Sequence, residues 1–388
     1  MSIRGRALIA GAFEHPGRLL PDSTIADIHA DVAAGALADA GLGFEDVDGY
    51  FCAGDAPGLG PLSMTDFLGI RPRHIDATET GGSSYLIHVA HAAEAIAAGR
   101  CRVALITLGG KPRTGGLAMG GEDAAFTPEH AFEAPFGPTF PALYALAASR
   151  HMHEYGTTSA QLAAVKVAAS RHAQHNPNAL LRTPVTVEEV LDSPLVADPL
   201  HRLDCCVITD GGGALVVVAP EVARGLDRHA VALLGAGEAV KGVDGGRIDL
   251  TRTAAAGSGP RAFAEAGVTP ADIGYASIYD SFTITVVQQI EDLGFCEKGQ
   301  GGAFVADGGL ESPDGRLPFN TDGGGLCNNH PANRGGMTKV IEAVRQLRGE
   351  AHPAVQVPDC ELAVAQGMGG ALGNRAASAT LVLGREAP

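Results

Sequence analysis

The chain has 388 residues, 45% of them hydrophobic, and carries 28 Lys and Arg against 44 Asp and Glu, for a formal net charge of −16. This length exceeds a single typical core, so two domains or two fused halves are expected. The acidic balance argues against nucleic acid and anionic membrane surfaces as partners, because both bind clustered cations.

The N-terminal segment does not resemble a signal peptide, because its apolar run is short and Phe13-Glu14-His15 interrupts it. No run of about 18 apolar residues occurs, so no membrane span is expected. The seven cysteines include no Cys-x-x-Cys pair, which favours reduced thiols in a cytoplasmic protein. His151 and His153 would point to different sides of a helix, so no metal site is expected.

An internal repeat starts early in the chain. Residues 36–55 align without gaps on residues 262–281, with Ala36, Ala38, Ala40, Gly41 and Asp46 over Ala262, Ala264, Ala266, Gly267 and Asp272. Each copy predicts a helix that ends in Ala-Gly, a turn with an acidic residue, and then a strand.

Two further segments repeat in the same order. Residues 92–100 resemble 339–349, and the strand-like residues 102–110 resemble 361–370. The repeats predict two similar αβ halves, residues 1–225 and 226–388, with a Gly/Pro-rich loop region at about 109–140 in the first. The second repeat places Gly82 over His330, so two helix N-termini would face one pocket, where backbone N–H groups can hold an oxyanion.

A turn leads into the small-residue helix predicted from Leu86 to Ala98. It reads Asp-Ala-Thr-Glu-Thr-Gly-Gly-Ser-Ser-Tyr from Asp76, and Gly82 stands where the helix is about to begin. We interpret Ser83 and Ser84 as helix-start residues, since serine is favoured there and no Gly-x-Ser-x-Gly elbow surrounds them. The segment Leu234–Glu238 lacks the third glycine of a dinucleotide-binding loop, which excludes that function.

Several motifs, in this order and spacing, resemble the thiolase superfamily, most closely its sterol-carrier-protein-type branch. They are Glu79-Thr80-Gly81-Gly82-Ser83-Ser84, Leu203-Asp204-Cys205-Cys206, Thr209-Asp210-Gly211-Gly212, Tyr279-Asp280-Ser281-Phe282, Asn320-Thr321-Asp322-Gly323-Gly324-Gly325, Asn329-His330-Pro331 and Gly367-Met368-Gly369-Gly370. The resemblance implies an α/β thiolase fold, with duplicated mixed-sheet halves in a five-layer αβαβα arrangement.

The chain departs from the family's catalytic pattern. Thiolases use a nucleophilic cysteine, a histidine beside it and a second cysteine near the C-terminus. The first two positions match Gly82 and His330, and the third falls just before or at Gly367, where no thiol exists. A glycine has no side chain to acylate. Tyr279 stands where the family places Asn or His to organise an oxyanion-binding water.

That combination resembles the lipid-transfer-protein aldolases, which cleave β-hydroxyacyl-CoA thioesters during sterol side-chain breakdown. The resemblance implies a C–C lyase with a coenzyme A thioester as substrate and no cofactor bound in this chain. It also implies a small companion protein with a zinc ribbon and an OB-fold. A second pocket tyrosine expected just before the His-Pro is replaced by Asn328 and Asn329.

The catalytic candidates are Tyr279 and His330. Tyr279 follows a strand predicted over 275–278 and would take or give a proton, although a tyrosine is a weak base unless its phenolate is stabilised. His330 can exchange a proton or donate to a thioester oxygen. A buried structural tyrosine and a helix-capping histidine are the alternatives.

Other residues have supporting or alternative roles. Gly82, Ser83, Asp280, Asn328 and Gly369 are expected to support the oxyanion site, with Asp280 capping a turn as the alternative. The cations after the strand at 102–110 could meet coenzyme A phosphates or remain solvated; these are Lys111 and Arg113.

Two other functions remain open. Cys327 could act as a displaced nucleophile in thiolase-type acyl transfer, provided that its thiol is exposed and its pKa lowered. The chain could also be a non-catalytic subunit that binds acyl-CoA. In all three cases the Ala-rich apolar surface suits a closed homodimer.

Overall fold

The computed structural model describes residues 2–115, 134–137, 139–242, 247–331, 335–372 and 375–387. Most of the predicted Gly/Pro-rich loop, residues 116–133 and 138, therefore lies outside the described residues. Nine strands form one mixed sheet in the order β3-β2-β4-β7-β1-β8-β11-β10-β9.

The sheet is built from two sets of strands that meet in the middle. The first set is β3 (His74–Asp76), β2 (Gly49–Phe51), β4 (Val103–Gly110), β7 (Gly211–Val218) and β1 (Leu8–Glu14). The second set is β8 (Val231–Lys241), β11 (Ala376–Gly384), β10 (Leu362–Gly370) and β9 (Tyr275–Ile278). A short antiparallel pairing of Leu8 with Ala232 and Ile9 with Val231 joins them.

The two sets have the same topology. In the first, β2 pairs in parallel with both β3 and β4. In the second, β9 pairs in parallel with β10, and a parallel bridge from Ala276 to Phe319 stands where a counterpart of β3 would be. The strand order is therefore the same in both halves, which supports the proposed duplication into 1–225 and 226–388.

The first internal repeat has the same local structure in both copies. Helices α1 (Ile25–Ala40) and α9 (Ala255–Ala266) end at Gly41 and Gly267, with φ of 71° and 69°. Such left-handed values favour glycine at a helix end. A 3₁₀ turn follows at Phe44–Asp46 and again at Pro270–Asp272, and then β2 or β9 begins.

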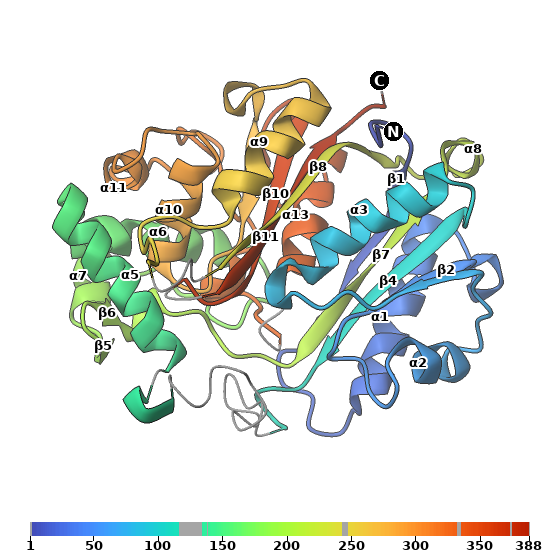
Figure 1. Cartoon of the computed structure of the whole chain (residues 1–388), viewed down its shortest axis with the longest axis horizontal. Coiled ribbons are helices and arrows are strands. Elements are labelled where there is room, and N and C mark those ends of the chain that lie inside the picture. The colour runs from blue at the N-terminus through green and yellow to red at the C-terminus, as the bar shows by residue number, and fades with distance from the viewer. Residues whose placement is uncertain are drawn as a thin grey trace.

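Helices cover both faces of the sheet and fill the space between its two parts, as Figure 1 shows. Helices α3 (Ser84–Ala97) and α13 (Gly336–Arg348) share one buried apolar cluster with strands of both sets. Helix α1 packs with the first set, and α9 and α10 (Thr283–Asp292) pack with the second. This agrees with the five-layer αβαβα arrangement expected from the sequence, with the difference that the two β layers are hydrogen-bonded to each other through β1 and β8.

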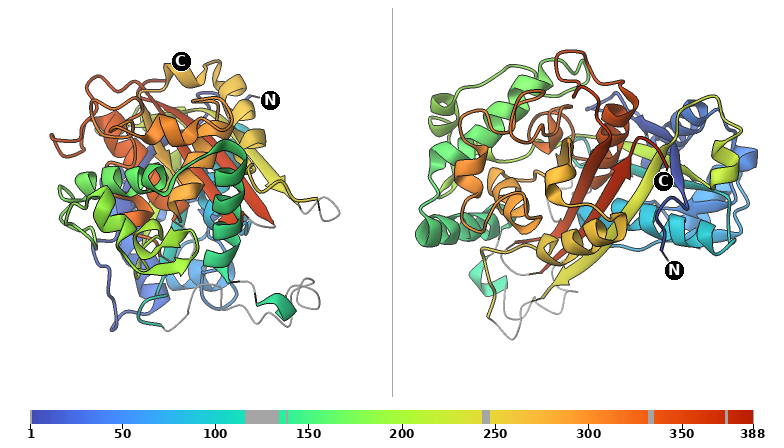
Figure 2. Two further views of the ribbon diagram at one scale, coloured as in Figure 1. Left: turned by 90° about the vertical axis from the view of Figure 1, so that its left-hand side faces the viewer. Right: turned by 90° about the horizontal axis from the view of Figure 1, so that it is seen from above.

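The segment between β4 and β7 crosses from one half to the other. Its helices α5 (Phe140–Tyr155), α6 (Ser159–Ala173) and α7 (Val187–Leu191) precede a small hairpin of β5 (Leu195–Ala197) and β6 (Leu200–His201). Helices α5 and α6 contribute to the apolar cluster of α10, α11 (Gly301–Val305) and α12 (Gly324–Cys327), and the group lies beside the second set of strands (Figure 2). A segment from the first half of the sequence thus packs on the second half.

Two short helices, α2 (Pro61–Phe67) and α8 (Pro220–Ala223), complete the described α-helices of the first half. Among the helices that the structure describes, none is long and apolar enough to cross a membrane.

Candidate active site

The N-termini of α3 and α13 meet in the middle layer. The first residue of α13 is Gly336, and a methyl group on it would overlap the carbonyl oxygen of Gly82, just before α3. Only glycine allows so close an approach of two backbones. Both helices therefore direct their positive dipole ends at one place, as the second repeat predicts.

The segments that lead into the two helices differ in length. Gly82 lies two residues before Ser84, whereas His330 lies six residues before Gly336. The alignment of Gly82 over His330 thus joins residues at unequal distances from their helices.

The ring of Tyr279 occupies the space in front of Gly82. A methyl group on Gly82 would collide with the Tyr279 ring, with Cζ at 2.6 Å, and with the carbonyl oxygen of Met368 on β10. Tyr279 follows β9 directly and is 4% exposed. In this backbone, a side chain at position 82 and the tyrosine exclude each other.

Tyr279 and His330 form a buried pair. Tyr279 Oη and His330 Nε2 are 2.9 Å apart, and the two rings meet edge to face with centroids 5.5 Å apart. Burial lowers the pKa of His330 to about 4, so the imidazole is neutral at pH 7. A neutral Nε2 can accept the phenol proton.

Backbone and side-chain contacts hold both residues in place. The Tyr279 N–H donates to the Gln366 carbonyl at 3.0 Å, and Gln289 Nε2 donates to the Tyr279 carbonyl at 2.7 Å. The His330 N–H donates to Thr209 Oγ1 at 3.0 Å. These three partners were not predicted from the sequence, because each lies outside the strand end or motif that carries Tyr279 or His330.

Asp280 pairs with a lysine that sequence reasoning did not single out. Its Oδ1 lies 2.8 Å from Lys339 Nζ on α13, and both side chains are buried. The carboxylate also accepts from the N–H groups of Gly325 and Leu326, at 2.8 and 3.1 Å. The sequence did contain a signal, because Lys339 stands among the apolar residues of α13. Among these are Val340, Ala343 and Leu347, which are all buried.

Asn328 lies in a separate polar network. Its Oδ1 accepts from Arg18 Nη2 at 2.7 Å, and its Nδ2 donates to Asp322 at 2.9 Å and to Glu14 at 3.1 Å. Both ends of the amide are thus engaged, and the structure does not bring it to the Tyr279–His330 pair. The oxyanion role of Asn328 stays a prediction.

The remaining supporting residues lie at the start of α3 or, in the case of Gly369 on β10, against it. Ser83 is buried, and its hydroxyl donates to the Thr80 carbonyl at 3.0 Å rather than to a base. A methyl group on Gly369 would overlap the same carbonyl. Gly82, Ser83 and Gly369 therefore shape the backbone at the site.

Cys327 is buried within the apolar cluster of the second half. Burial raises the pKa of its thiol, although Lys166 acts in the opposite direction. A reactive thiolate needs a lowered pKa and access, and Cys327 has neither.

The two candidate phosphate ligands are held by neighbouring carbonyls. Lys111 Nζ donates to the Ser23 and Pro21 carbonyls at 2.5 and 3.1 Å, and Arg113 Nη1 donates to the Ile208 carbonyl at 3.0 Å. Their contact with coenzyme A stays a prediction.

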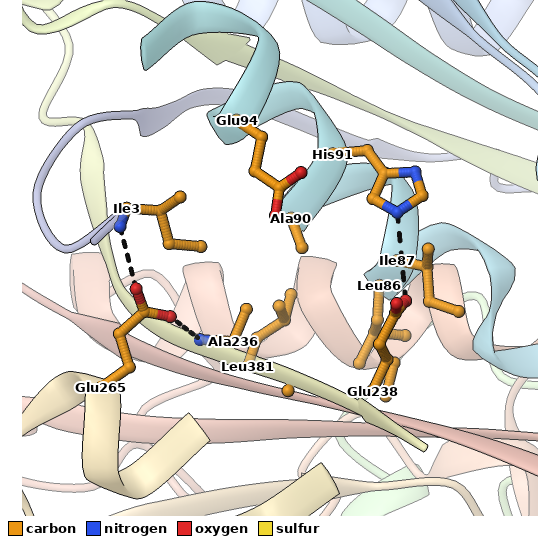
Figure 3. Close-up of a pocket in the computed structure, with 12 residues that line it drawn as sticks. Ile3, Leu86, Ile87, Ala90, His91, Glu94, Ala236, Glu238, Glu265 and Leu381 are labelled. Carbon is orange, nitrogen blue, oxygen red and sulfur yellow. Dashed lines mark hydrogen bonds and ion pairs between the residues drawn. The ribbon is translucent and has the colours of Figure 1, made fainter. Parts of the chain in front are cut away.

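A hollow of about 190 Å³ lies elsewhere, between α3 and β8 (Figure 3). His91 and Glu94 line it from α3 and Glu238 from β8, above an apolar floor. It contains neither Tyr279 nor His330. Within the described ranges, no cluster of three or more His, Cys, Asp or Glu side chains could hold a metal ion.

Comparison with known proteins agrees with the fold. The family model described as "Thiolase C-terminal domain-like" matches residues 237–385. An acetyl-CoA acetyltransferase of Methanothermobacter thermautotrophicus is 34% identical over 363 residues, which cover 92% of this chain and 94% of that protein. The chain belongs to the thiolase superfamily.

Among its relatives is a steroid side-chain-cleaving aldolase of Thermomonospora curvata, 38% identical over 81% of this chain and 83% of that protein. The solved structure of an Ltp2-ChsH2(DUF35) aldolase superposes with a TM-score of 0.89 at 33% identity, covering 98% of each chain. The expected resemblance to aldolases of this superfamily is confirmed.

Proposed function

We propose that the chain is a thiolase-like aldolase that cleaves a β-hydroxyacyl-CoA thioester by a retro-aldol reaction. The observation that carries the proposal is the hydrogen-bonded pair of Tyr279 and His330, whose tyrosine ring stands in front of Gly82. A site with an acid–base pair and no thiol is suited to proton transfer, and not to acyl transfer.

The geometry supports a relay of the proton. Tyr279 Oη takes the proton of the substrate's β-hydroxyl as its own proton passes to His330 Nε2, 2.9 Å away. The electron pair of the new alkoxide forms the carbonyl of a ketone or aldehyde, and the Cα–Cβ bond breaks. The electrons of that bond become the enolate of the shortened acyl-CoA, and a proton returned to Cα completes the reaction.

The enolate needs stabilisation. The N-termini of α3 and α13 converge on this place, and positive dipole ends favour a developing negative charge. Preorganised donors of this kind typically contribute about 3–4 kcal/mol to a transition state. We assign the enolate oxygen to the backbone around Gly82 and Ser83.

Relatives favour a steroid side-chain thioester as the substrate. One is named a steroid side-chain-cleaving aldolase, and a 17-hydroxy-3-oxo-4-pregnene-20-carboxyl-CoA lyase of Mycobacterium tuberculosis is 35% identical over 82% of this chain. Thiolase-type acyl transfer is less well supported, because the thiol of Cys327 is buried with a raised pKa.

We also propose two protein partners. The solved structure that superposes with a TM-score of 0.89 is named an Ltp2-ChsH2(DUF35) aldolase, so its name includes a second protein beside the aldolase. This supports a zinc-ribbon/OB-fold companion for this chain. A second copy of the chain is the other partner. The seven free cysteines fit the reducing cytoplasm.

The experiment is a cleavage assay with the purified chain and its co-expressed companion on a β-hydroxyacyl-CoA thioester of a steroid side chain. Tyr279→Phe removes the hydroxyl and keeps the ring, so turnover should fall about 10²–10⁴-fold with little change in stability. The control is Cys327→Ala, which should retain most of the activity. Full activity of Tyr279→Phe beside an inactive Cys327→Ala would reject the tyrosine relay in favour of chemistry at Cys327.

A further inference from the structure

We propose that Lys339 is a positioning residue of this site: its ammonium offsets the charge of Asp280 beside His330 and so helps burial to keep the imidazole neutral, which lets Nε2 accept the proton of Tyr279. The inference rests on the proposed function and assigns a role to a residue that acts on His330 together with its partner Asp280.

The geometry places the ion pair beside the histidine. A methyl group on Gly325 would meet Asp280 Oδ1 at 3.1 Å and His330 Cδ2 at 3.2 Å, so the carboxylate and the ring lie against the same small residue. Lys339 Nζ lies 2.8 Å from that Oδ1, with side-chain exposures of 1% and 0% for the two partners. Water therefore screens neither charge well.

In the described part of the chain, the charges that act on His330 come from two elements. Asp280 extends from the end of β9, next to Tyr279, and Lys339 from the first turn of α13. Among the residues that the structure describes, Thr209 also contacts His330; it precedes β7 and is uncharged. Asp322 and Glu14 raise the pKa of the lysine.

The two charges act on His330 with opposite signs. Burial is the largest influence and lowers the pKa of His330, Asp280 raises it, and Lys339 lowers it again. Burial alone would also lower the pKa of Lys339, but Asp280 and Asp322 raise it above the usual range, so the lysine stays charged.

Without the lysine, the carboxylate would favour the imidazolium. An imidazolium donates from both ring nitrogens and cannot accept the proton of Tyr279. Asp280 cannot turn away, because the N–H groups of Gly325 and Leu326 hold it. The lysine therefore compensates a carboxylate that the backbone fixes beside the relay.

The test compares three variants in the full chain with its companion. Lys339→Met keeps a long apolar side chain and removes the positive charge, Asp280→Asn removes the negative charge, and the double variant removes both. The titration of His330 is followed by NMR of histidine-labelled protein, with the signal assigned by its loss in His330→Gln. The pH dependence of cleavage is measured alongside.

We expect the pKa of His330 to shift in opposite directions in the two single variants. The pKa of His330 should rise by about one unit or more in Lys339→Met and fall in Asp280→Asn. In the double variant it should return toward the wild-type value, which keeps the test valid if a single variant folds poorly. The acid limb of the cleavage profile should move to higher pH in Lys339→Met.

A purely structural lysine gives another pattern. If the variants only loosened the site and admitted water, the pKa of His330 would rise in both single variants, and the proposal would be overturned. An unchanged titration in Lys339→Met would overturn it as well. Opposite displacements in a protein that cleaves no thioester would support the role of Lys339 and reject the proposed function.

Discussion

At the scale of single residues, the site depends on which side chain fills one small volume. A thiolase needs a side chain at the position of Gly82, and here the ring of Tyr279 takes that space. The glycine at position 82, which removes the thiol, and the phenol of Tyr279 therefore belong to one structural change, because a thiol and the phenol cannot both fill the same space. Restoring the cysteine alone cannot restore the thiolase site.

We predict that Gly82→Cys will not yield a reactive thiol. The new side chain would collide with the Tyr279 ring and the Met368 carbonyl, so overpacking should cost about 1–3 kcal/mol and the lyase activity should be lost. Thermal unfolding and cleavage assays check this. Gly242→Cys is the matched control, since a methyl group there would meet nothing within 4 Å. Wild-type stability and activity of Gly82→Cys would contradict the steric argument.

At the scale of elements, the contact between the starts of α3 and α13 sets the geometry of the site. The glycine that opens α13 lies against the backbone that precedes α3. The closeness concentrates two helix dipoles where the enolate is proposed to form. It also leaves no room for a β-carbon at position 336.

We predict that Gly336→Ala will lower both stability and turnover. The methyl group would overlap the Gly82 carbonyl oxygen, which is backbone and cannot rotate away, so the helices must separate. The melting temperature should fall by about 1–2 °C for each kcal/mol lost, because the shift is inversely proportional to the unfolding entropy and that entropy grows with chain length. Gly242→Ala should leave both quantities unchanged. A fully active Gly336→Ala would mean that the helix contact is unnecessary for catalysis.

At the scale of the whole molecule, burial keeps several histidines neutral. Burial lowers the pKa of His88, His172 and His330 to about 4. In the unfolded chain these groups titrate near 6.5, so between these values the unfolded state binds more protons. Their contribution to stability is thus complete above about pH 6.5 and is lost as pH falls toward 4.

We predict that the free energy of unfolding decreases steeply from pH 6.5 to 4. Each histidine contributes on the order of 3 kcal/mol over that window. Glu342 acts in the opposite direction, because burial raises its pKa to about 7. Denaturant unfolding across this range measures the slope, and His172→Gln should make it shallower. An equal slope in that variant would show that His172 is already charged in the folded protein.

The outer edge of the sheet supports the predicted homodimer. In the described part of the chain, β3 pairs only with β2 and its other edge is unpaired, with Ile75 44% exposed. Leu59 and Leu62, just before and within α2 of the same half, are 75% and 61% exposed. An unpaired edge strand is a template for a second strand.

We predict that the wild type sediments as a dimer at micromolar concentration and that Ile75→Lys moves the equilibrium toward the monomer. A lysine on an edge strand opposes pairing with another copy. Val240→Lys is the control, because Val240 is 80% exposed on β8, far from that edge in the strand order. A monomeric wild type would contradict the prediction.

The sequence alone determined much of the fold. The spacing of Ala36–Asp55 and its repeat specified helix, turn and strand, because helix ends such as Gly41 and Gly267 need a left-handed backbone that glycine adopts easily. It also placed Tyr279 at a strand end and His330 before a helix. These features depend on residues that are close together along the chain, so the local sequence is enough to predict them.

Only the tertiary structure decided which side chains meet. It brought Tyr279 against Gly82 and His330, turned Asn328 toward Arg18 and Asp322, buried Cys327, and paired Asp280 with Lys339. Each of these contacts joins residues from different elements. The physical reason is that their proximity and burial arise from the packing of α3, α13 and the two sets of strands, which no single segment of the sequence specifies.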